Sequence, residues 1–238
     1  MLRALAGRDD SSGVSEVART TGLAKSTCSR ILSSLDDLGI VERVDEAGRY
    51  VIGPGLRALA AAGAPVGTLR DLAEPYLRDL AGRLGESVAL AVMDGGEGLY
   101  MTQVAAPGPV QVTDWTGQRF PLHTIAAGQA FMSSWSDEQV ADYAADGLAG
   151  YTEHTVTTLV GLRQRVGEVR RRGVAWTVGE FSEEITGVAA PVRDPDGEAV
   201  ASVSIYGPGW RFPGDADTTE IERLVRETAE RVGGLLGD

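Results

Sequence analysis

The stretch SEVARTTGLAKSTCSRILSSLDDLG, residues 15–39, has the pattern of two short helices joined by a tight turn. The first helix is expected over residues 15–20 with Ser15 as its N-cap, and Gly22 can take the positive φ that the turn requires. The second helix is expected over residues 25–38, where the apolar residues recur at helical spacing. These residues are Cys28, Ile31, Leu32, Leu35 and Leu38. Two short helices around a glycine turn make a helix-turn-helix.

The opposite face of the second helix carries short hydroxyls and cations. These residues are Lys25, Ser26, Thr27, Ser29 and Arg30. Small side chains let a helix approach the base edges in the major groove of DNA, where an arginine can bond guanine with two hydrogen bonds. We therefore assign these five residues to DNA binding. The alternative is an ordinary solvated helix face.

The residues that follow predict a two-stranded hairpin. Strands are expected over residues 40–44 and 49–52, and the turn between them ends on a glycine. A hairpin placed directly after a helix-turn-helix forms a wing. Arg43 and Arg49 lie in this hairpin and can contact the DNA backbone, which adds affinity without sequence information. The wing favours DNA binding over the solvated-face alternative.

The charge of the chain is unevenly distributed. The net charge is −12, yet residues 1–60 carry eight basic and eight acidic side chains, so all of the excess acid lies in the remainder. Only the first part can approach phosphate without strong repulsion. One cysteine and two histidines exclude an internal disulfide and argue against a Cys/His zinc site. No apolar run reaches the roughly 18–20 residues that span a bilayer, so a cytoplasmic protein without a membrane partner is expected.

These motifs resemble the N-terminal domain of IclR-family transcriptional regulators. The resemblance rests on residues 21–32, 38–41 and 48–54, and it continues through nearly the whole chain. It implies that a linker helix helps to pair the DNA-binding domains. The family usually has a longer first helix, of which only residues 2–6 remain here. Two explanations stay open: the start codon is chosen too late, or the winged domain lacks part of its usual core and is less stable.

The rest of the chain alternates between helical and strand patterns. Helices are expected over residues 69–84, 124–135, 136–145 and 159–172, and from Asp217, which opens a capping box with Glu220. Strands are expected over residues 87–93, 99–104, 109–115, 174–178, 187–192 and 199–206. This order predicts an α+β fold with a mostly antiparallel sheet flanked by helices. The resemblance implies a sensor domain related to GAF and PAS domains.

Three parts follow from these patterns. Residues 1–54 form the winged helix-turn-helix, residues 55–68 the linker, and residues 69–238 the effector-binding and oligomerisation domain. Alanine and leucine favour a short helix in the linker, and Gly63 and Pro65 end it. A flexible linker is the alternative.

The resemblance also implies the residues that border an effector pocket. These are Gly128, Trp176, Gly187, Ser204 and Tyr206. A glycine at 128 lets backbone amides at a helix start approach a carboxylate, and Ser204 and Tyr206 share one face of a strand. Small-molecule sites are largely apolar with a few placed donors. The alternative for Trp176 is packing in the core, and for Ser204 a hydrogen bond to a neighbouring backbone group.

Tyr206 and Trp176 make the expected pocket aromatic. Our hypothesis is therefore a flat or aromatic carboxylate as effector rather than a two-carbon acid. Glu180, Glu183 and Glu184 lie close in sequence, but an exposed acidic loop is favoured over a catalytic pair, because nothing nearby supplies a nucleophile or a metal.

The sequence thus predicts a ligand-responsive regulator of a catabolic or metabolic operon. Two copies, as a dimer or a dimer of dimers, would bind a palindromic double-stranded operator, and no cofactor is expected. An enzyme is the rival class, but the sequence lacks a glycine-rich nucleotide loop and a Gly-x-Ser-x-Gly elbow. A second rival is a sensor that has lost DNA binding, against which the presence of Lys25, Arg30 and Arg49 argues. The effector, the regulated genes and the sign of regulation stay open.

Overall fold

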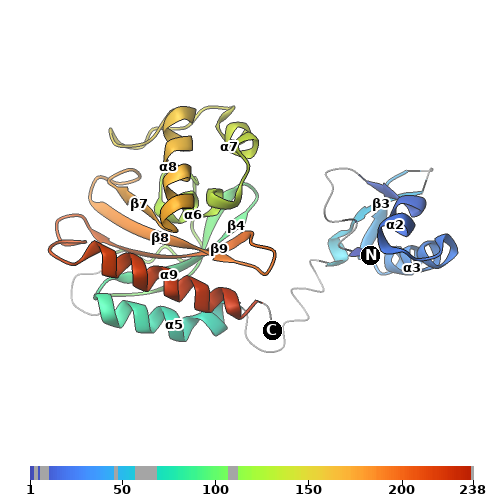
Figure 1. The fold of residues 1–238 in the computed structure, drawn as a ribbon, viewed down its shortest axis with the longest axis horizontal. Coiled ribbons are helices and arrows are strands. Elements are labelled where there is room, and N and C mark those ends of the chain that lie inside the picture. The colour runs from blue at the N-terminus through green and yellow to red at the C-terminus, as the bar shows by residue number, and fades with distance from the viewer. Residues whose placement is uncertain (3–4, 6–10, 46–47, 57–68, 107–111, 237–238) are drawn as a thin grey trace. The chain divides into compact units, whose positions relative to one another are not determined.

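The structure is a computed structural model that describes residues 1–2, 5, 11–45, 48–56, 69–106 and 112–236. The chain divides into two compact units, Met1–Val66 and Gly67–Asp238, and each is considered by itself (Figure 1). The expected linker over residues 55–68 and the remnant of a first helix over residues 2–6 lie largely outside the described residues.

In the described part of the first unit, two helices of eight or more residues lie beside a small antiparallel sheet. The helices are α2 (Val14–Thr21) and α3 (Lys25–Asp37), and the strands β1 (Ser12–Gly13), β2 (Val41–Arg43) and β3 (Arg49–Ile52) pair in the order β1-β3-β2. Gly22 has a φ of 71°, so it ends α2 in the left-handed conformation that the turn was expected to need. The helix-turn-helix and the wing hairpin are both present.

Two details of the first unit differ from expectation. Gly13 rather than Ser15 is the N-cap of α2, because the chain enters the helix directly from β1, a strand that was not predicted. Ile31 on α3 is 37% exposed, and Leu38, the C-cap of this helix, is 67% exposed. The core side of the helix is therefore narrower than its apolar pattern. It consists of Cys28, Leu32 and the half-buried Leu35, which pack with Leu5, Val17, Val41 and Tyr50.

The second unit is built on one antiparallel sheet with strand order β6-β5-β4-β9-β8-β7. Its strands are β4 (Ser87–Asp94), β5 (Glu97–Val104), β6 (Arg119–Phe120), β7 (Ala175–Val178), β8 (Ile185–Arg193) and β9 (Ala199–Pro208). Its helices are α5 (Leu69–Leu84), α6 (Ala126–Phe131), α7 (Asp137–Ala144), α8 (Leu159–Arg172) and α9 (Thr218–Gly234). Figure 1 shows α5 and α9 against one face of the sheet and α6, α7 and α8 on the other. The α+β architecture is as predicted.

The two faces of the sheet carry separate cores because side chains alternate along each strand. On β9, Val203 and Ile205 pack with α5 and α9. Tyr206 packs with α6 and α8 on the opposite side. This alternation decides which side chains reach the α6 side, where the cavity described below is found.

Three expected elements of the second unit are corrected. The strand expected over residues 109–115 is not formed at residues 112–115, and β6 pairs with β5 in its place. The helix expected over residues 124–135 is shorter, because the chain tightens into a 3₁₀ turn at Met132–Ser134. Asp217 caps α9 through the Thr219 amide, but no capping box forms, since the Glu220 carboxylate bonds Arg223 instead.

Candidate functional site

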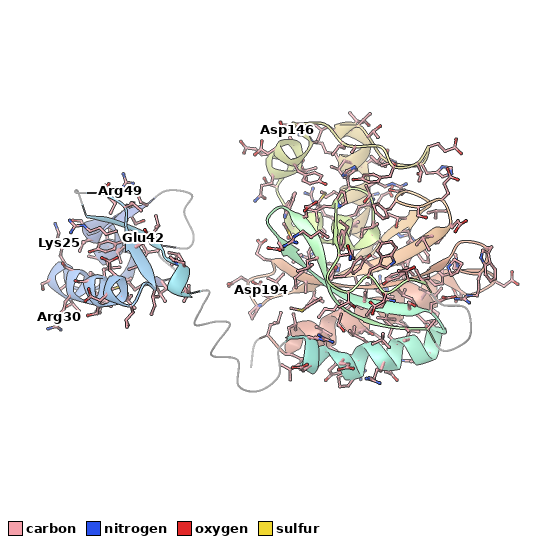
Figure 2. All side chains as sticks on the ribbon, turned by 180° about the vertical axis from the view of Figure 1, so that it is seen from behind. Lys25, Arg30, Glu42, Arg49, Asp146 and Asp194 are labelled. Atoms are coloured by element: carbon pink, nitrogen blue, oxygen red, sulfur yellow. The ribbon has the colours of Figure 1, made fainter. Side chains whose placement is uncertain are left out.

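The first candidate surface is the outer face of α3. Cys28 and Leu32 are fully buried beneath this helix, so the opposite positions face solvent. Lys25, Ser26, Ser29 and Arg30 are exposed, and Thr27 is half-buried. Figure 2 shows Lys25 and Arg30 projecting outward from the helix. The structure thus brings the five predicted residues to one end of one helix.

This surface is available to an anion. Within the described residues, no acidic group pairs with the side chains of Lys25 or Arg30, and the first turn of α3 contains no acid. Asp36, near the other end of α3, accepts a hydrogen bond from the Arg43 backbone at 3.1 Å. The acids of the helix therefore stand away from its cationic end.

The two wing arginines are both exposed but have structural contacts. The Arg49 guanidinium donates to the Ser11 carbonyl at 2.5 Å and 3.2 Å, which ties β3 to the segment before β1. The Arg43 guanidinium lies beside Gly48 across the hairpin. Arg49 retains further N–H groups for a phosphate, since guanidinium has five donors. Its first role in this unit is nevertheless to hold the sheet together.

The second candidate site is a cavity of about 230 Å³ on the α6 side of the sheet. Its aromatic walls are Tyr100, Trp115, Phe120, Phe181 and Tyr206. Its other lining residues are Gln118, Arg119, Thr124, Ile125, Ala126, Ala127, Thr177, Glu180, Ser182, Ile185, Gly187, Ser204 and Ile205. A mostly apolar cavity with a few placed hydroxyls is the usual form of a small-molecule site.

Three of the five predicted effector residues line this cavity, namely Gly187, Ser204 and Tyr206. The Tyr206 hydroxyl donates to Gln103 Oε1 at 2.5 Å. The same oxygen accepts from the backbone amide of Trp115 at 3.0 Å. Gln103 thus connects the base of the cavity to the segment that carries Trp115. Ser204 makes only a long hydrogen bond, 3.4 Å, to the Ala89 carbonyl.

The other two predicted residues lie outside the cavity. The Trp176 ring stacks on Phe212 at 5.9 Å, and its Nε1 donates to Glu222 at 2.9 Å, on the side of the sheet that faces α9. Its neighbour Thr177 lines the cavity, because adjacent residues of a strand face opposite sides. Gly128 is buried, and its amide already bonds the Ile125 carbonyl at 3.0 Å.

Several lining residues were not predicted from the sequence. Tyr100, Trp115 and Phe181 lie in segments far apart in the chain, and only the fold brings them together. The Trp115 and Phe181 rings meet edge to face at 6.4 Å, and Tyr151 contacts Phe181 at 5.1 Å. In β5, Tyr100 is buried between two half-buried neighbours. The sequence Leu-Tyr-Met at residues 99–101 is apolar throughout, so it does not indicate which of these side chains faces the cavity.

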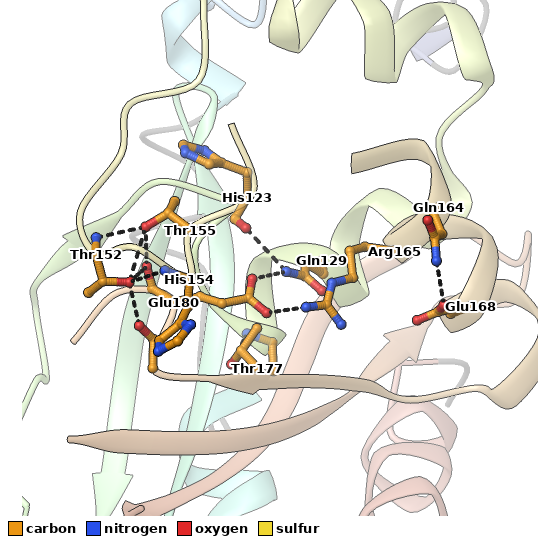
Figure 3. A network of polar contacts seen from close by, with 12 residues as sticks. His123, Gln129, Thr152, His154, Thr155, Gln164, Arg165, Glu168, Thr177 and Glu180 are labelled. Carbon is orange, nitrogen blue, oxygen red and sulfur yellow. Dashed lines mark hydrogen bonds and ion pairs between the residues drawn. The ribbon is translucent and has the colours of Figure 1, made fainter. Parts of the chain in front are cut away.

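Glu180 forms a buried polar network next to the cavity (Figure 3). Its side chain is 1% exposed, and its carboxylate accepts from Arg165 at 2.8 Å and from Gln129 at 3.1 Å. Thr155 donates to the Glu180 carbonyl at 2.6 Å. The expectation that Glu180 belongs to an exposed acidic loop is therefore wrong, while Glu183 and Glu184 are exposed as expected.

Burial raises the pKa of the Glu180 carboxyl from 4.5 to about 7, although Arg165 and Gln129 act to lower it. Between these two pH values the folded protein retains a proton that the unfolded chain has lost. We therefore expect this group to lower the free energy of unfolding by about 3 kcal/mol as the pH rises from 4.5 to 7, with no further change above that.

Glu180→Gln removes this titration. Urea unfolding of both proteins at pH 5 and pH 8 should show the variant gaining stability relative to the parent at the higher pH. Glu183→Gln, at an exposed position, is the matched control and should follow the parent. If the Glu180→Gln and parent curves run parallel across this range, the carboxyl does not titrate as described.

His123 is a structural residue, as its surroundings show. Its Nδ1 lies 2.9 Å from the Tyr143 hydroxyl and its Nε2 lies 2.9 Å from the Ala149 carbonyl oxygen. Both ring nitrogens thus have protein partners. Among the residues that the structure describes, no group of three or more His, Cys, Asp or Glu side chains could hold a metal ion. Nor does any helix in these residues have the length and apolar character needed to cross a membrane.

Comparison with known proteins covers both units. Residues 1–45 match the IclR helix-turn-helix domain, and residues 66–233 match the bacterial transcriptional regulator IclR C-terminal domain. The chain is 34% identical to the glycerol operon regulatory protein of Streptomyces griseus over 238 residues, which is 100% of this chain and 93% of that protein. It is 30% identical to the transcriptional repressor IclR of Escherichia coli, over 98% of this chain and 85% of the repressor.

A solved structure has the same architecture. The crystal structure of Thermotoga maritima IclR superposes with a TM-score of 0.68 at 27% identity, covering 100% of this chain and 96% of the other. Both units of the chain therefore have counterparts in a single known protein.

Proposed function

The chain belongs to the IclR family of transcriptional regulators, and on that basis we propose which of its surfaces bind DNA and effector and how it assembles. Its N-terminal helix-turn-helix binds DNA, and its C-terminal domain binds a small-molecule effector. We place the winged domain at residues 1–54, the linker at 55–68 and the effector-binding domain at 69–238.

In the proposed complex, α3 lies in the major groove. Lys25, Ser26, Thr27, Ser29 and Arg30 would face the bases and the adjoining phosphates. The observation that carries this assignment is that all five lie at one end of α3 with no acid beside them. Arg43 and Arg49 of the wing hairpin would contact flanking phosphates, which position the protein without reading sequence.

The chain would act in the cytoplasm as a symmetric dimer or a dimer of dimers on a palindromic operator. A single winged domain buries little surface on DNA, and a second copy roughly doubles the contacts. Protein symmetry would then fix the spacing of the half-sites.

The cavity beside α6 is the proposed effector site, with Gly187, Ser204 and Tyr206 among its contacts. A ligand there changes DNA affinity only if it favours one arrangement of the paired winged domains over another. Because the Tyr206 hydroxyl is bonded through Gln103 to the Trp115 backbone, a ligand that contacts Tyr206 also acts on Trp115, which lines the cavity.

DNA selection with the full-length protein, followed by a salt titration on the winning sequence, tests the proposal. We expect enrichment of one palindrome. The affinity should fall steeply as the salt concentration rises, because lysine and arginine side chains that bind phosphates release counterions from the DNA. Enrichment of a sequence without two-fold symmetry would contradict the dimeric arrangement. Absence of any enrichment would contradict sequence-specific binding by this chain.

A further inference from the structure

The walls of the effector cavity are mainly aromatic and its size is limited. Its volume of about 230 Å³ exceeds the roughly 150 Å³ of an engineered apolar cavity that binds benzene. It therefore has room for a benzene ring with a small substituent. The rings of Tyr100 and Phe120 lie 4.6 Å apart, and those of Tyr100 and Tyr206 lie 6.0 Å apart, so the aromatic wall around Tyr100 is continuous.

The cavity offers no cation to a ligand carboxylate. Apart from tyrosines, its only ionisable lining residues in the described part of the chain are Arg119 and Glu180. Arg119 forms an ion pair with Asp94, and both side chains are about half exposed. Its charge is therefore already compensated by Asp94 and by solvent. Residues 107–111, Pro-Gly-Pro-Val-Gln, contribute no basic side chain.

Glu180 makes the cavity less favourable for an anionic ligand. Its buried carboxylate accepts hydrogen bonds from the guanidinium of Arg165 and the side-chain amide of Gln129, so these two groups are not available to a ligand. An anionic ligand in the cavity would lie near this acid without a cation of its own. Burying a charge without a partner is strongly unfavourable.

Among the two tyrosines of the wall, only Tyr100 has a hydroxyl without a partner in the described residues. Tyr100 is 9% exposed and lines the cavity, yet no polar atom of the described residues bonds its hydroxyl. The Tyr206 hydroxyl, by contrast, is taken by Gln103. The Tyr100 oxygen is not fully enclosed by protein, so a ligand in the cavity can reach the hydroxyl and form a hydrogen bond with it.

We propose that the effector is an uncharged aromatic molecule of the size of a substituted benzene, with an oxygen or nitrogen group that bonds the Tyr100 hydroxyl. The inference rests on the cavity being the effector site proposed above. The proposed effector has the aromatic ring that the sequence predicts, but a neutral polar group takes the place of the predicted carboxylate.

Three probes of nearly equal size test the charge of the ligand. Acetophenone, benzamide and benzoate share one ring and differ in the attached group. Binding to the full-length protein is measured by calorimetry at pH 8, where benzoate is ionised. We expect both neutral compounds to bind at least tenfold more tightly than benzoate. Equal or tighter binding of benzoate, or no binding of either neutral compound, would overturn the proposal.

A pair of variants tests the role of Tyr100. Tyr100→Phe is expected to weaken acetophenone binding about three- to tenfold, as for one lost hydrogen bond, and to leave ethylbenzene binding unchanged. Tyr206→Phe, whose hydroxyl serves Gln103, should change the binding of both compounds by the same factor. Circular dichroism confirms that each variant is folded. Equal weakening of both compounds by Tyr100→Phe would contradict the assignment.

Operator binding by the same preparations, measured without any probe, separates the two proposals. Intact DNA binding together with failed neutral probes would overturn only the ligand class. Loss of specific DNA binding by the parent chain would overturn the proposed function.

Discussion

Replacing both Lys25 and Arg30 by alanine is expected to weaken operator binding by at least about 100-fold. A base contact of the bidentate kind contributes about 1–3 kcal/mol, and each lost phosphate contact also removes a released counterion. The slope of log K against log salt should therefore become shallower by about one to two units per winged domain. Fluorescence anisotropy with the selected operator, measured at several salt concentrations, gives both quantities.

Arg171→Ala is a control for the loss of a positive charge outside α3. It removes a positive charge from an exposed position on α8 of the second unit, and this residue is not one of the proposed DNA contacts. We expect operator affinity to change by less than about twofold, because Arg171 makes none of the proposed DNA contacts and salt screens the general attraction of surface charges. Ligand binding by the double alanine variant should equal that of the parent. If the double variant binds the operator as the parent does, α3 is not the reading helix.

Gly128→Ala is expected to destabilise the second unit by about 3 kcal/mol, the upper end of the usual cost of overpacking. A Cβ at this position would lie 2.1 Å from the Leu122 carbonyl oxygen and 2.4 Å from the Leu122 Cα, both of them backbone atoms. Rotation of a side chain cannot relieve such an overlap, so α6 would have to move. The midpoint of thermal unfolding should fall by roughly 6–12 °C, measured by the near-ultraviolet signal of the tryptophans.

Gly167→Ala tests the same substitution at a site with room for it. This glycine lies inside α8, where a Cβ would meet only Arg171 Nη1 at 3.7 Å. Because alanine is the better helix former, we expect a gain of about 0.5–1 kcal/mol. If Gly128→Ala lowers the free energy of unfolding and Gly167→Ala raises it, the loss at residue 128 is due to the steric overlap and not to replacing glycine by alanine in general. A tolerated alanine at 128 would show that α6 and residue 122 are less closely packed than described.

The glycine at position 128 is explained by the packing of α6 against the Leu122 backbone. From the sequence, this glycine was assigned to the approach of a ligand carboxylate to helix amides. In the structure it permits the approach of α6 to the Leu122 backbone. Both explanations need a residue without a side chain, so the sequence could not distinguish them. The distances to Leu122 favour the packing role.

By itself, the sequence determined the features that depend on neighbours in the chain. The helix-turn-helix follows from a period of three to four residues and a glycine at 22, and the surface of Lys25 to Arg30 lies on a single helix. The α+β order of the second unit follows in the same way. Helical and strand periods are local properties, so they can be recognised without knowing the fold.

The tertiary structure alone decided the cavity. Its walls come from β5 to β9, from α6 and from the residues after β7, and no local pattern determines that these segments meet. The direction of each side chain on β7 also depends on how the sheet packs, because a shift of one residue exchanges its faces. That is why Thr177 lines the cavity while Trp176 packs against Phe212. Contacts between distant segments arise only when a sheet and its helices pack together, and those contacts determine which ligand this chain can bind.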